Sequence, residues 1–398
     1  MKRITIIGTG LGISTMTSEA IEAIKQADVL FGSPRVLKEY KSLESKTYPF
    51  YLPNEVAEIL IYDDAQEFAV LVSGDVGFYS AAAGFLEVLA AFDYEIRLVP
   101  GVSTVNAFFA KLKLPWQDAA FVSAHGREMN VVDIVRRNHL TFCLTGNNVN
   151  EIGRMLDCAG FGRMPGYVGE NLGMDEECVY VTVASELKQG DYPSLTVLLF
   201  INEAFDSRTP YGLPDDCFSR APGIPMTKSE TRAVILSKLN LRPADICWDI
   251  GAGTGSVTVE MALNAYSGRV FAVERREEGI SLVEQNCSAF HIGNVKTVCG
   301  EAPSVLAALP VPDAVFIGGS GGKIQEIIDI ILQKNSDVRI VVTAVTIETI
   351  VSTMECFTKS GLEPEFTQIS VARSKPVGNL HMMEAQNPVT IINAGVKR

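Results

Sequence analysis

The feature that most constrains this chain is an apolar segment of strand length that runs into three alternate glycines, Gly251, Gly253 and Gly255. The apolar segment covers residues 245–250, and an apolar segment of helical length, residues 256–263, follows the glycines. This order is typical of a strand, a tight turn and a helix. Glycines let the backbone approach a ligand, and the next helix offers free N–H groups to an anion. We therefore expect a ligand-binding turn here.

A carboxylate follows this turn in register. The next predicted strand, residues 269–274, ends in Glu274, about 20 residues after the last glycine, where a carboxylate can accept both hydroxyls of a ribose. The dinucleotide fingerprint requires a further glycine where this chain has Ser256. The pattern indicates a nucleotide-containing cofactor and resembles the first two motifs of the Rossmann-like S-adenosylmethionine (SAM) methyltransferases. For the glycine loop alone, a plain strand-to-helix turn is the alternative.

Composition limits the partners of the chain. Its 398 residues, 47% of them hydrophobic, exceed one typical domain and favour two. A net charge of −13 argues against nucleic-acid or anionic-membrane partners, which require a positive surface. The eight cysteines form no C-x-x-C pair, so we expect reduced thiols and no metal site. The chain starts directly with a predicted strand and has no apolar run of membrane-spanning length, so we expect a cytoplasmic protein.

The N-terminal half repeats the strand-and-glycine design three times. Predicted strands end in Gly8-Thr9-Gly10, in Ser73-Gly74-Asp75 and in residues 100–104, Pro-Gly-Val-Ser-Thr. Each single loop is equally compatible with an ordinary turn. In an open parallel sheet, however, loops at the carboxyl ends of strands share one edge and can converge on one ligand. We expect the three loops to form one site.

These loops, together with Gly32-Ser33-Pro34-Arg35 and Ser123-Ala124-His125-Gly126-Arg127, resemble the tetrapyrrole methylases, over residues 1 to about 204. The His-Gly-Arg signature is similar to the branch that methylates carbon 5 of a precorrin. Leu11 and Val76 stand where the family often has proline, which affects loop shape more than ligand identity. The resemblance implies that SAM contacts Gly8, Gly10, Ser73, Gly74, Asp75, Phe78, Ser103 and Thr104.

A segment with four prolines, residues 205–226, separates the two halves. Its composition is typical of a linker or an ordered junction. We predict a first domain at 1–204, a linker at 205–211 and a second domain at 212–398. Within the second domain, Thr227 and Glu230 have the spacing of a capping box at the start of a helix.

The second domain resembles the precorrin carbon-15 methyltransferases. The resemblance rests on Pro-Met-Thr-Lys-x-Glu-x-Arg-Ala at 225–233, the glycine loop with its acid, and Gly-Glu-Ala-Pro at 300–303. The predicted fold is α/β throughout: a tetrapyrrole methylase (class III SAM methyltransferase) fold followed by a seven-stranded Rossmann-like class I fold. The resemblance implies SAM contacts at Thr227, Gly251, Ala252, Gly253, Thr254, Gly255, Glu274 and Ala302.

In combination, the chain resembles the bifunctional decarboxylating precorrin methyltransferases of cobalamin synthesis. That resemblance implies methylation of carbons 5 and 15, loss of CO₂ from the ring-C acetate, and a homo-oligomer. The substrate carries carboxylates, which basic side chains receive. Candidates are Arg35, Arg127 and, in a predicted basic loop at 370–376, Arg373 and Lys375. We predict no specific catalytic residue, because methyl transfer can depend mainly on alignment and on exclusion of water.

Three alternatives stay open at this level. One is an NAD(P)-dependent oxidoreductase, which the G-x-G-x-G spacing of the glycines in both halves disfavours. Another is a non-catalytic sensor of SAM or of a tetrapyrrole, and a third is an enzyme in which only one domain is active.

Overall fold

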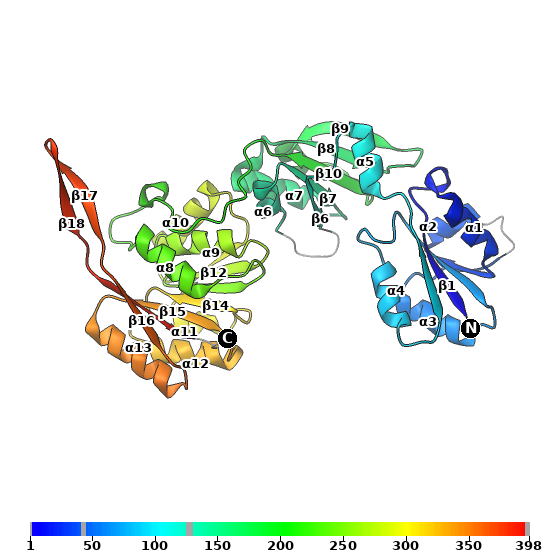
Figure 1. Ribbon diagram of the computed structural model, residues 1–398. Helices are drawn as coiled ribbons and strands as arrows, with labels where there is room; N and C mark the ends of the chain where they lie inside the picture. The colour runs from blue at the N-terminus through cyan, green and yellow to red at the C-terminus, as the bar shows by residue number, and fades with distance from the viewer. Residues whose placement is uncertain (1, 41–44, 125–129, 395–398) are drawn as a thin grey trace.

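The computed structural model describes residues 2–40, 45–124 and 130–394, which form three sheets with flanking helices and a projecting two-stranded arm (Figure 1). The first sheet is parallel and has the order β3-β2-β4-β1-β5. Its strands are β1 (Arg3–Gly8), β2 (Val29–Gly32), β3 (Lys46–Tyr48), β4 (Glu67–Val72) and β5 (Glu95–Val99). Its helices are α1 (Ser18–Gln26), α2 (Pro34–Leu37), α3 (Pro53–Tyr62) and α4 (Ala82–Leu89), with short 3₁₀ turns η1 (Ile13–Thr15) and η2 (Lys38–Tyr40).

The apolar strands of this sheet are covered on both faces. Ile6 and Phe68 belong to a cluster on one face, and Ile7 and Leu71 to a cluster on the other. Continuous apolar strands of this kind are typical of parallel sheets between two helical layers. The arrangement leaves the carboxyl ends of the strands as the edge where polar loops can gather.

The second sheet has the order β6-β7-β10-β8-β9 and is antiparallel except for the β6–β7 pair. Its strands are β6 (Ala119–Ser123), β7 (Leu140–Leu144), β8 (Pro165–Glu170), β9 (Cys178–Val183) and β10 (Thr196–Ile201). The accompanying helical elements are α5 (Thr104–Leu112), α6 (Val131–Arg137), α7 (Val149–Leu156), η3 (Asp157–Phe161) and η4 (Ala184–Lys188). Phe108 and Phe109 of α5 pack against Phe142 of β7, so this helix ties the first sheet to the second.

The third sheet confirms the predicted seven strands, in the order β13-β12-β11-β14-β15-β19-β16 with β19 antiparallel. They are β11 (Ile246–Ile250), β12 (Arg269–Glu274), β13 (Val295–Cys299), β14 (Ala314–Ile317), β15 (Arg339–Ala344), β16 (Glu365–Ile369) and β19 (Val389–Ala394). The helical elements are η5 (Asp215–Cys217), α8 (Ser229–Leu239), α9 (Ser256–Asn264), α10 (Glu277–Ala289), α11 (Ala302–Leu306), α12 (Ile324–Lys334) and α13 (Ile347–Lys359).

The prediction of a basic loop at 370–376 is wrong. This segment instead enters an antiparallel pair, β17 (Ala372–Val377) and β18 (Leu380–Ala385), which we call the arm. The arm projects from the third sheet (Figure 1), and almost all of its side chains are exposed. Its two-residue turn contains Gly378 at φ 59°, a conformation that glycine adopts without strain. The basic residues of this segment do not predict a hairpin that projects without packing against the rest of the domain.

The second sheet's helices contact the C-terminal half directly. The Asn130 amide donates to the carbonyl of Tyr266 at 3.2 Å, and the Arg137 guanidinium lies 4.2 Å from the centre of the Tyr266 ring. The rings of Phe161 and His291 pack at a tilt of 35° with their centres 4.6 Å apart. Within the described ranges, no helix has the length and apolarity to cross a membrane.

Candidate functional sites

The three glycine loops of the N-terminal half meet at one edge of the first sheet, as predicted. Gly10 and Gly74 exchange backbone hydrogen bonds of 3.0 and 2.8 Å. A Cβ added at Gly8 would lie 2.7 Å from both Gly101 N and Gly74 O. The three strand ends are therefore packed backbone to backbone, which side chains larger than hydrogen would prevent.

Asp75 stabilises this arrangement of the loops with two hydrogen bonds. Its Oδ1 accepts from Gly77 N at 2.7 Å and its Oδ2 accepts from Gly101 N at 3.1 Å. The neighbouring Ser103 caps α5 by accepting from Asn106 N at 3.3 Å. Both side chains thus hold the shape of the loops, and Asp75 joins the β4 loop to the β5 loop.

A cavity of about 1160 Å³ lies against these loops. The loops of the first sheet line one side, and residues around β8 and β10 of the second sheet line the other. Of the predicted cofactor residues, the lining includes Gly10, Ser73, Gly74, Asp75, Phe78, Ser103 and Thr104. Gly8 lies behind the lining in the packed loops. Arg127 lies outside the described residues.

Several residues of this lining were missed by sequence reasoning. From the second sheet they are Leu144, Thr145, Leu172–Glu176 and Ser194–Val197. These residues carry no motif, and only the packing of the second sheet against the first brings them to the cavity. From the first sheet, Lys38 also lines the cavity beside Arg35, whose guanidinium donates to Ser73 Oγ at 3.0 Å.

The C-terminal glycine loop has the left-handed backbone conformation that glycine adopts without strain. Gly251, Gly253 and Gly255 have φ values of 76°, 56° and 76°. A Cβ at Gly253 would lie 2.6 Å from Pro225 O, and one at Gly251 would lie 2.8 Å from Gly319 N. The loop is therefore in close contact with Pro225 on one side and with Gly319, just after β14, on the other.

Glu274 is held in this loop by two backbone donors. Its Oε2 accepts from Gly253 N at 3.0 Å, and its Oε1 accepts from Arg276 N at 3.0 Å. The side chain is buried yet lines a cavity of about 210 Å³. This fixed carboxylate beside a glycine loop suits the diol of a ribose.

The cavity contains some of the predicted contacts and not others. Gly251, Gly253, Glu274 and Ala302 line it. Ala252, Thr254, Gly255 and Thr227 do not, and Thr254 is fully buried. Lining residues beyond the predicted contacts are Ile224, Pro225, Val273, Arg275, Arg276, Gly300, Glu301 and Gly318–Gly321.

Asp249, at the end of β11, is completely buried behind the loop. Its carboxylate accepts from Thr258 Oγ1, while Oδ1 has no partner among the described residues. Burial raises the pKa of this carboxyl to about 7. The group is therefore a buried acid poised to titrate near neutrality.

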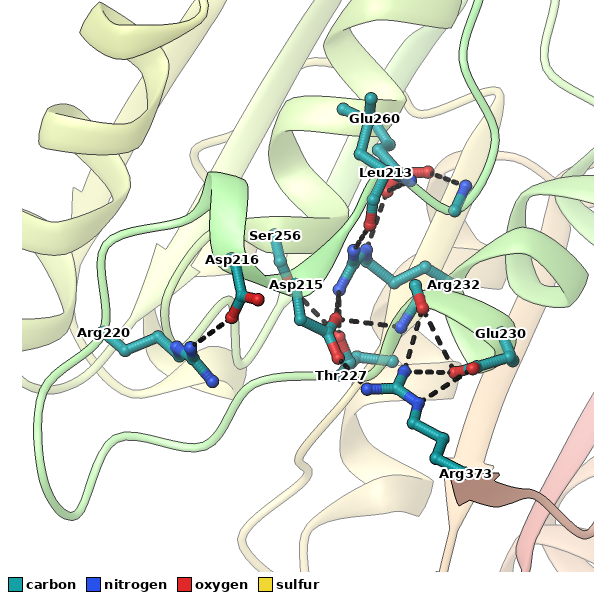
Figure 2. Close-up of polar contacts among 12 residues, drawn as sticks. Leu213, Asp215, Asp216, Arg220, Thr227, Glu230, Arg232, Ser256, Glu260 and Arg373 are labelled. Atoms are coloured by element: carbon teal, nitrogen blue, oxygen red, sulfur yellow. Dashed lines mark hydrogen bonds and ion pairs between the residues drawn. The ribbon is translucent and has the colours of Figure 1, made fainter. Parts of the chain in front are cut away.

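Glu230 does not form the predicted capping box. Helix α8 begins at Ser229, its N-cap is Lys228, and no side chain caps it. Glu230 instead accepts from Arg373 Nε at 2.9 Å, because the arm brings this guanidinium to the start of α8 (Figure 2). Arg373 also pairs with Asp215, at 2.8 Å. Lys375, also on β17, instead pairs with Glu384 of β18 at 3.2 Å.

Two family models match the chain. The model of tetrapyrrole (corrin/porphyrin) methylases matches residues 3–188, and that of the precorrin methyltransferase domain matches residues 217–395. The chain is 44% identical over 185 residues to the probable cobalt-precorrin-6B C(15)-methyltransferase (decarboxylating) of Pyrobaculum calidifontis, covering 46% of this chain and 95% of that relative. A crystal structure titled precorrin-6Y C5,15-methyltransferase, from Geobacter metallireducens, is 41% identical with a TM-score of 0.45, covering 46% of this chain and 97% of that one.

One relative extends along both halves. The precorrin-6Y C(5,15)-methyltransferase [decarboxylating] of a Sinorhizobium species is 30% identical over 401 residues, which cover 97% of this chain and 95% of the relative. The predicted pairing of a tetrapyrrole methylase fold with a Rossmann-like methyltransferase fold is thereby confirmed. The chain belongs to the family of decarboxylating precorrin-6Y C5,15-methyltransferases.

Proposed function

We propose that this chain methylates a late precorrin of the precorrin-6B type at carbons 5 and 15, and releases CO₂ from the ring-C acetate, in cobalamin biosynthesis. The observation that carries the proposal is the presence of two separate glycine-lined cavities in a chain that aligns end to end with a bifunctional relative. We assign carbon 5 to residues 1–204 and carbon 15 with decarboxylation to residues 212–398, joined by 205–211.

The residues present fit SAM in both halves. Tetrapyrrole methylases and precorrin methyltransferases use SAM as the methyl donor. In the C-terminal half, Glu274 would receive the ribose hydroxyls and the backbone at Gly251 and Gly253 would lie against the cofactor. In the N-terminal half, the Ser73–Asp75 loop and the hydroxyls of Ser103 and Thr104 would hold it.

When bound, SAM supplies an activated methyl group whose sulfur leaves as a neutral thioether, so the chain need not protonate a leaving group. What the chain contributes is alignment of donor and acceptor and exclusion of water. The packed loops joined by Asp75 serve alignment in the N-terminal half. For this reason we still assign no general acid or base.

The N-terminal cavity is large enough for a cofactor and part of a macrocycle. Its volume of about 1160 Å³ lies above the range that is usual for ligand pockets, roughly 300–1,000 Å³. We propose that Arg35 and Lys38, which line the cavity, receive carboxylates of the substrate. In the described chain, Lys38 has no ion-pair partner that would compete.

Arg127 and Lys375 remain proposed substrate ligands of the two halves. Arg373 differs from them, because its guanidinium is already paired with Glu230 and Asp215. A substrate carboxylate at Arg373 would therefore have to compete with these two acids.

We further propose a cytoplasmic homo-oligomer without a nucleic-acid partner. The net charge of −13 supports the last point. The arm exposes Leu380, Met382 and Met383 at 75%, 55% and 63%, and exposed apolar side chains on both faces of a hairpin favour association. Sedimentation equilibrium of the full chain would give the oligomeric state, and a monomer would contradict it.

The experiment that tests the function is anaerobic incubation with SAM and a late precorrin, with metal-free and cobalt-bound substrate in parallel, followed by product mass. Two methyl gains with one CO₂ loss are expected. One methyl gain without CO₂ loss would leave carbon 15 unsupported, and an unchanged mass despite SAM binding would favour a sensor.

A further inference from the structure

The segment that covers the C-terminal cofactor cavity is anchored by a buried ion-pair network. We call residues 212–227 the cap, because Ile224 and Pro225 within it line the cavity. Pro225 O accepts from Thr254 N at 3.4 Å, so the cap also touches the glycine loop directly. The position of the cap therefore sets the shape of one cavity wall.

Arg232 of α8 anchors the cap from inside (Figure 2). This side chain is fully buried, and its guanidinium donates to the carbonyl oxygens of Leu213 and Thr227 at the two ends of the cap. It also pairs with Glu260 at 2.7 Å and with Asp215 at 3.0 Å. Arg232 is thus a structural anchor within the core of the C-terminal half.

Arg373 reaches the same anchor from the arm. Its Nη1 donates to Asp215 Oδ2 at 2.8 Å, so Asp215 lies between the two guanidinium groups, which share its carboxylate. Its other nitrogens donate to Glu230 and, at 2.9 Å, to Ser229 Oγ, both in the first turn of α8. The root of the arm is therefore linked through one carboxylate to the cap of the cofactor cavity.

The electrostatics favour this link. The hydrogen bonds from Arg373 lower the pKa of Glu230 to about 2, so the acid is ionised at neutral pH. Glu230 and Arg373 are only half-buried, so solvent screens the pair and its strength comes from paired geometry rather than from burial. Such a link can position a segment without being required for folding.

From this geometry we propose that Arg373 is a positioning residue for the C-terminal cofactor site, through which the arm holds the cap in its cofactor-binding position. The inference rests on the proposed function, because it takes the ligand of this cavity to be SAM. It gives Arg373 a task distinct from contact with the reacting atoms or with substrate carboxylates.

The test titrates the full chain with S-adenosylhomocysteine by calorimetry, which requires no precorrin and no turnover. The transition of the C-terminal site is identified by its loss in Gly253→Ala, whose Cβ would lie 2.6 Å from Pro225 O. Arg373→Met removes the link at similar side-chain length, and Arg373→Lys restores the charge without the paired geometry. If the cap occupies its binding position roughly a tenth of the time in Arg373→Met, Kd at this site rises roughly tenfold.

Arg220→Met is the matched control. Arg220 lies in the same cap and pairs with Asp216 at 2.8 Å, but this pair faces solvent, where Asp216 is 93% exposed (Figure 2). We expect unchanged affinity in Arg220→Met, weakened affinity in Arg373→Met and in Glu230→Gln, and partial recovery in Arg373→Lys. The N-terminal transition should stay unchanged in all four, and with substrate KM for SAM should rise while kcat at saturating SAM is kept.

Unchanged C-terminal affinity in both Arg373→Met and Glu230→Gln would overturn the proposal, as would equal weakening in Arg220→Met. If the wild-type chain shows no C-terminal transition at all, the proposed function itself fails. That failure is recognised from the comparison of the wild-type chain with Gly253→Ala, before the variants of Arg373, Glu230 and Arg220 are titrated.

Discussion

Gly101→Ala tests whether the packed loops of the N-terminal half form a cofactor site. An added Cβ would meet Gly74 O and would lie 2.6 Å from Gly8 O, whereas real Cβ atoms keep at least 3.0 Å from such atoms. The loops must therefore open by about 0.4 Å or more at Gly8 alone. Because these atoms are backbone, no side chain can rotate away to relieve the clash.

The expected magnitude follows from the cost of overpacking, about 1–3 kcal/mol, which the cofactor-bound arrangement has to bear. That cost corresponds to a Kd for S-adenosylhomocysteine that rises roughly five- to more than a hundredfold at this site. In a calorimetric titration at cofactor concentrations that fill both wild-type sites, the apparent stoichiometry should fall from about two per chain towards one.

Gly84→Ala is the control within the same domain. Its Cβ would lie 3.3 Å from Pro53 Cγ, and alanine suits the interior of α4 better than glycine does. We expect two sites with wild-type affinity in this variant. Two sites of unchanged affinity in Gly101→Ala would refute the assignment of the N-terminal loops.

Three further predictions follow from the C-terminal half. Glu274→Ala should weaken cofactor binding at the C-terminal site, since it removes the carboxylate beside Gly253, and an unchanged isotherm would exclude Glu274 as a ribose ligand. Arg232→Leu should lower the free energy of unfolding in urea by about 3–5 kcal/mol because Glu260 is left buried without its cation, whereas Arg220→Leu at an exposed pair should cost less than about 1 kcal/mol. Burial raises the pKa of Asp249 to about 7, so the folded chain keeps a proton that the unfolded chain loses near pH 4, and the free energy of unfolding should fall as pH rises from about 4 to about 7. Asp249→Asn should reduce that fall, measured by urea titrations at pH 5 and pH 8. An equally large fall in the variant would contradict the prediction.

Much of the architecture could be predicted from local patterns. Residues 269–274 form a strand with the predicted bounds, because a mostly buried apolar run next to a glycine leaves little choice of register. The convergence of the Gly8, Gly74 and Gly101 loops also followed, since parallel strands place their carboxyl ends at one edge.

The parts that could not be predicted depend on contacts between distant segments. The spacing of Thr227 and Glu230 satisfied the rule for a capping box, but a guanidinium more than a hundred residues later recruits Glu230 instead. The arm carries no buried face, so its strands lack the apolar alternation by which strands are recognised. Likewise, residues 172–176 reach the N-terminal cavity only because the second sheet packs over it.

The central claim is that one chain performs two methylations and one decarboxylation. The most direct measurement is the ratio of S-adenosylhomocysteine formed to CO₂ released during complete conversion of a late precorrin by the wild-type chain. We predict a ratio of two to one. A ratio of one to one would contradict the claim, because it would leave the N-terminal half without a methylation of its own.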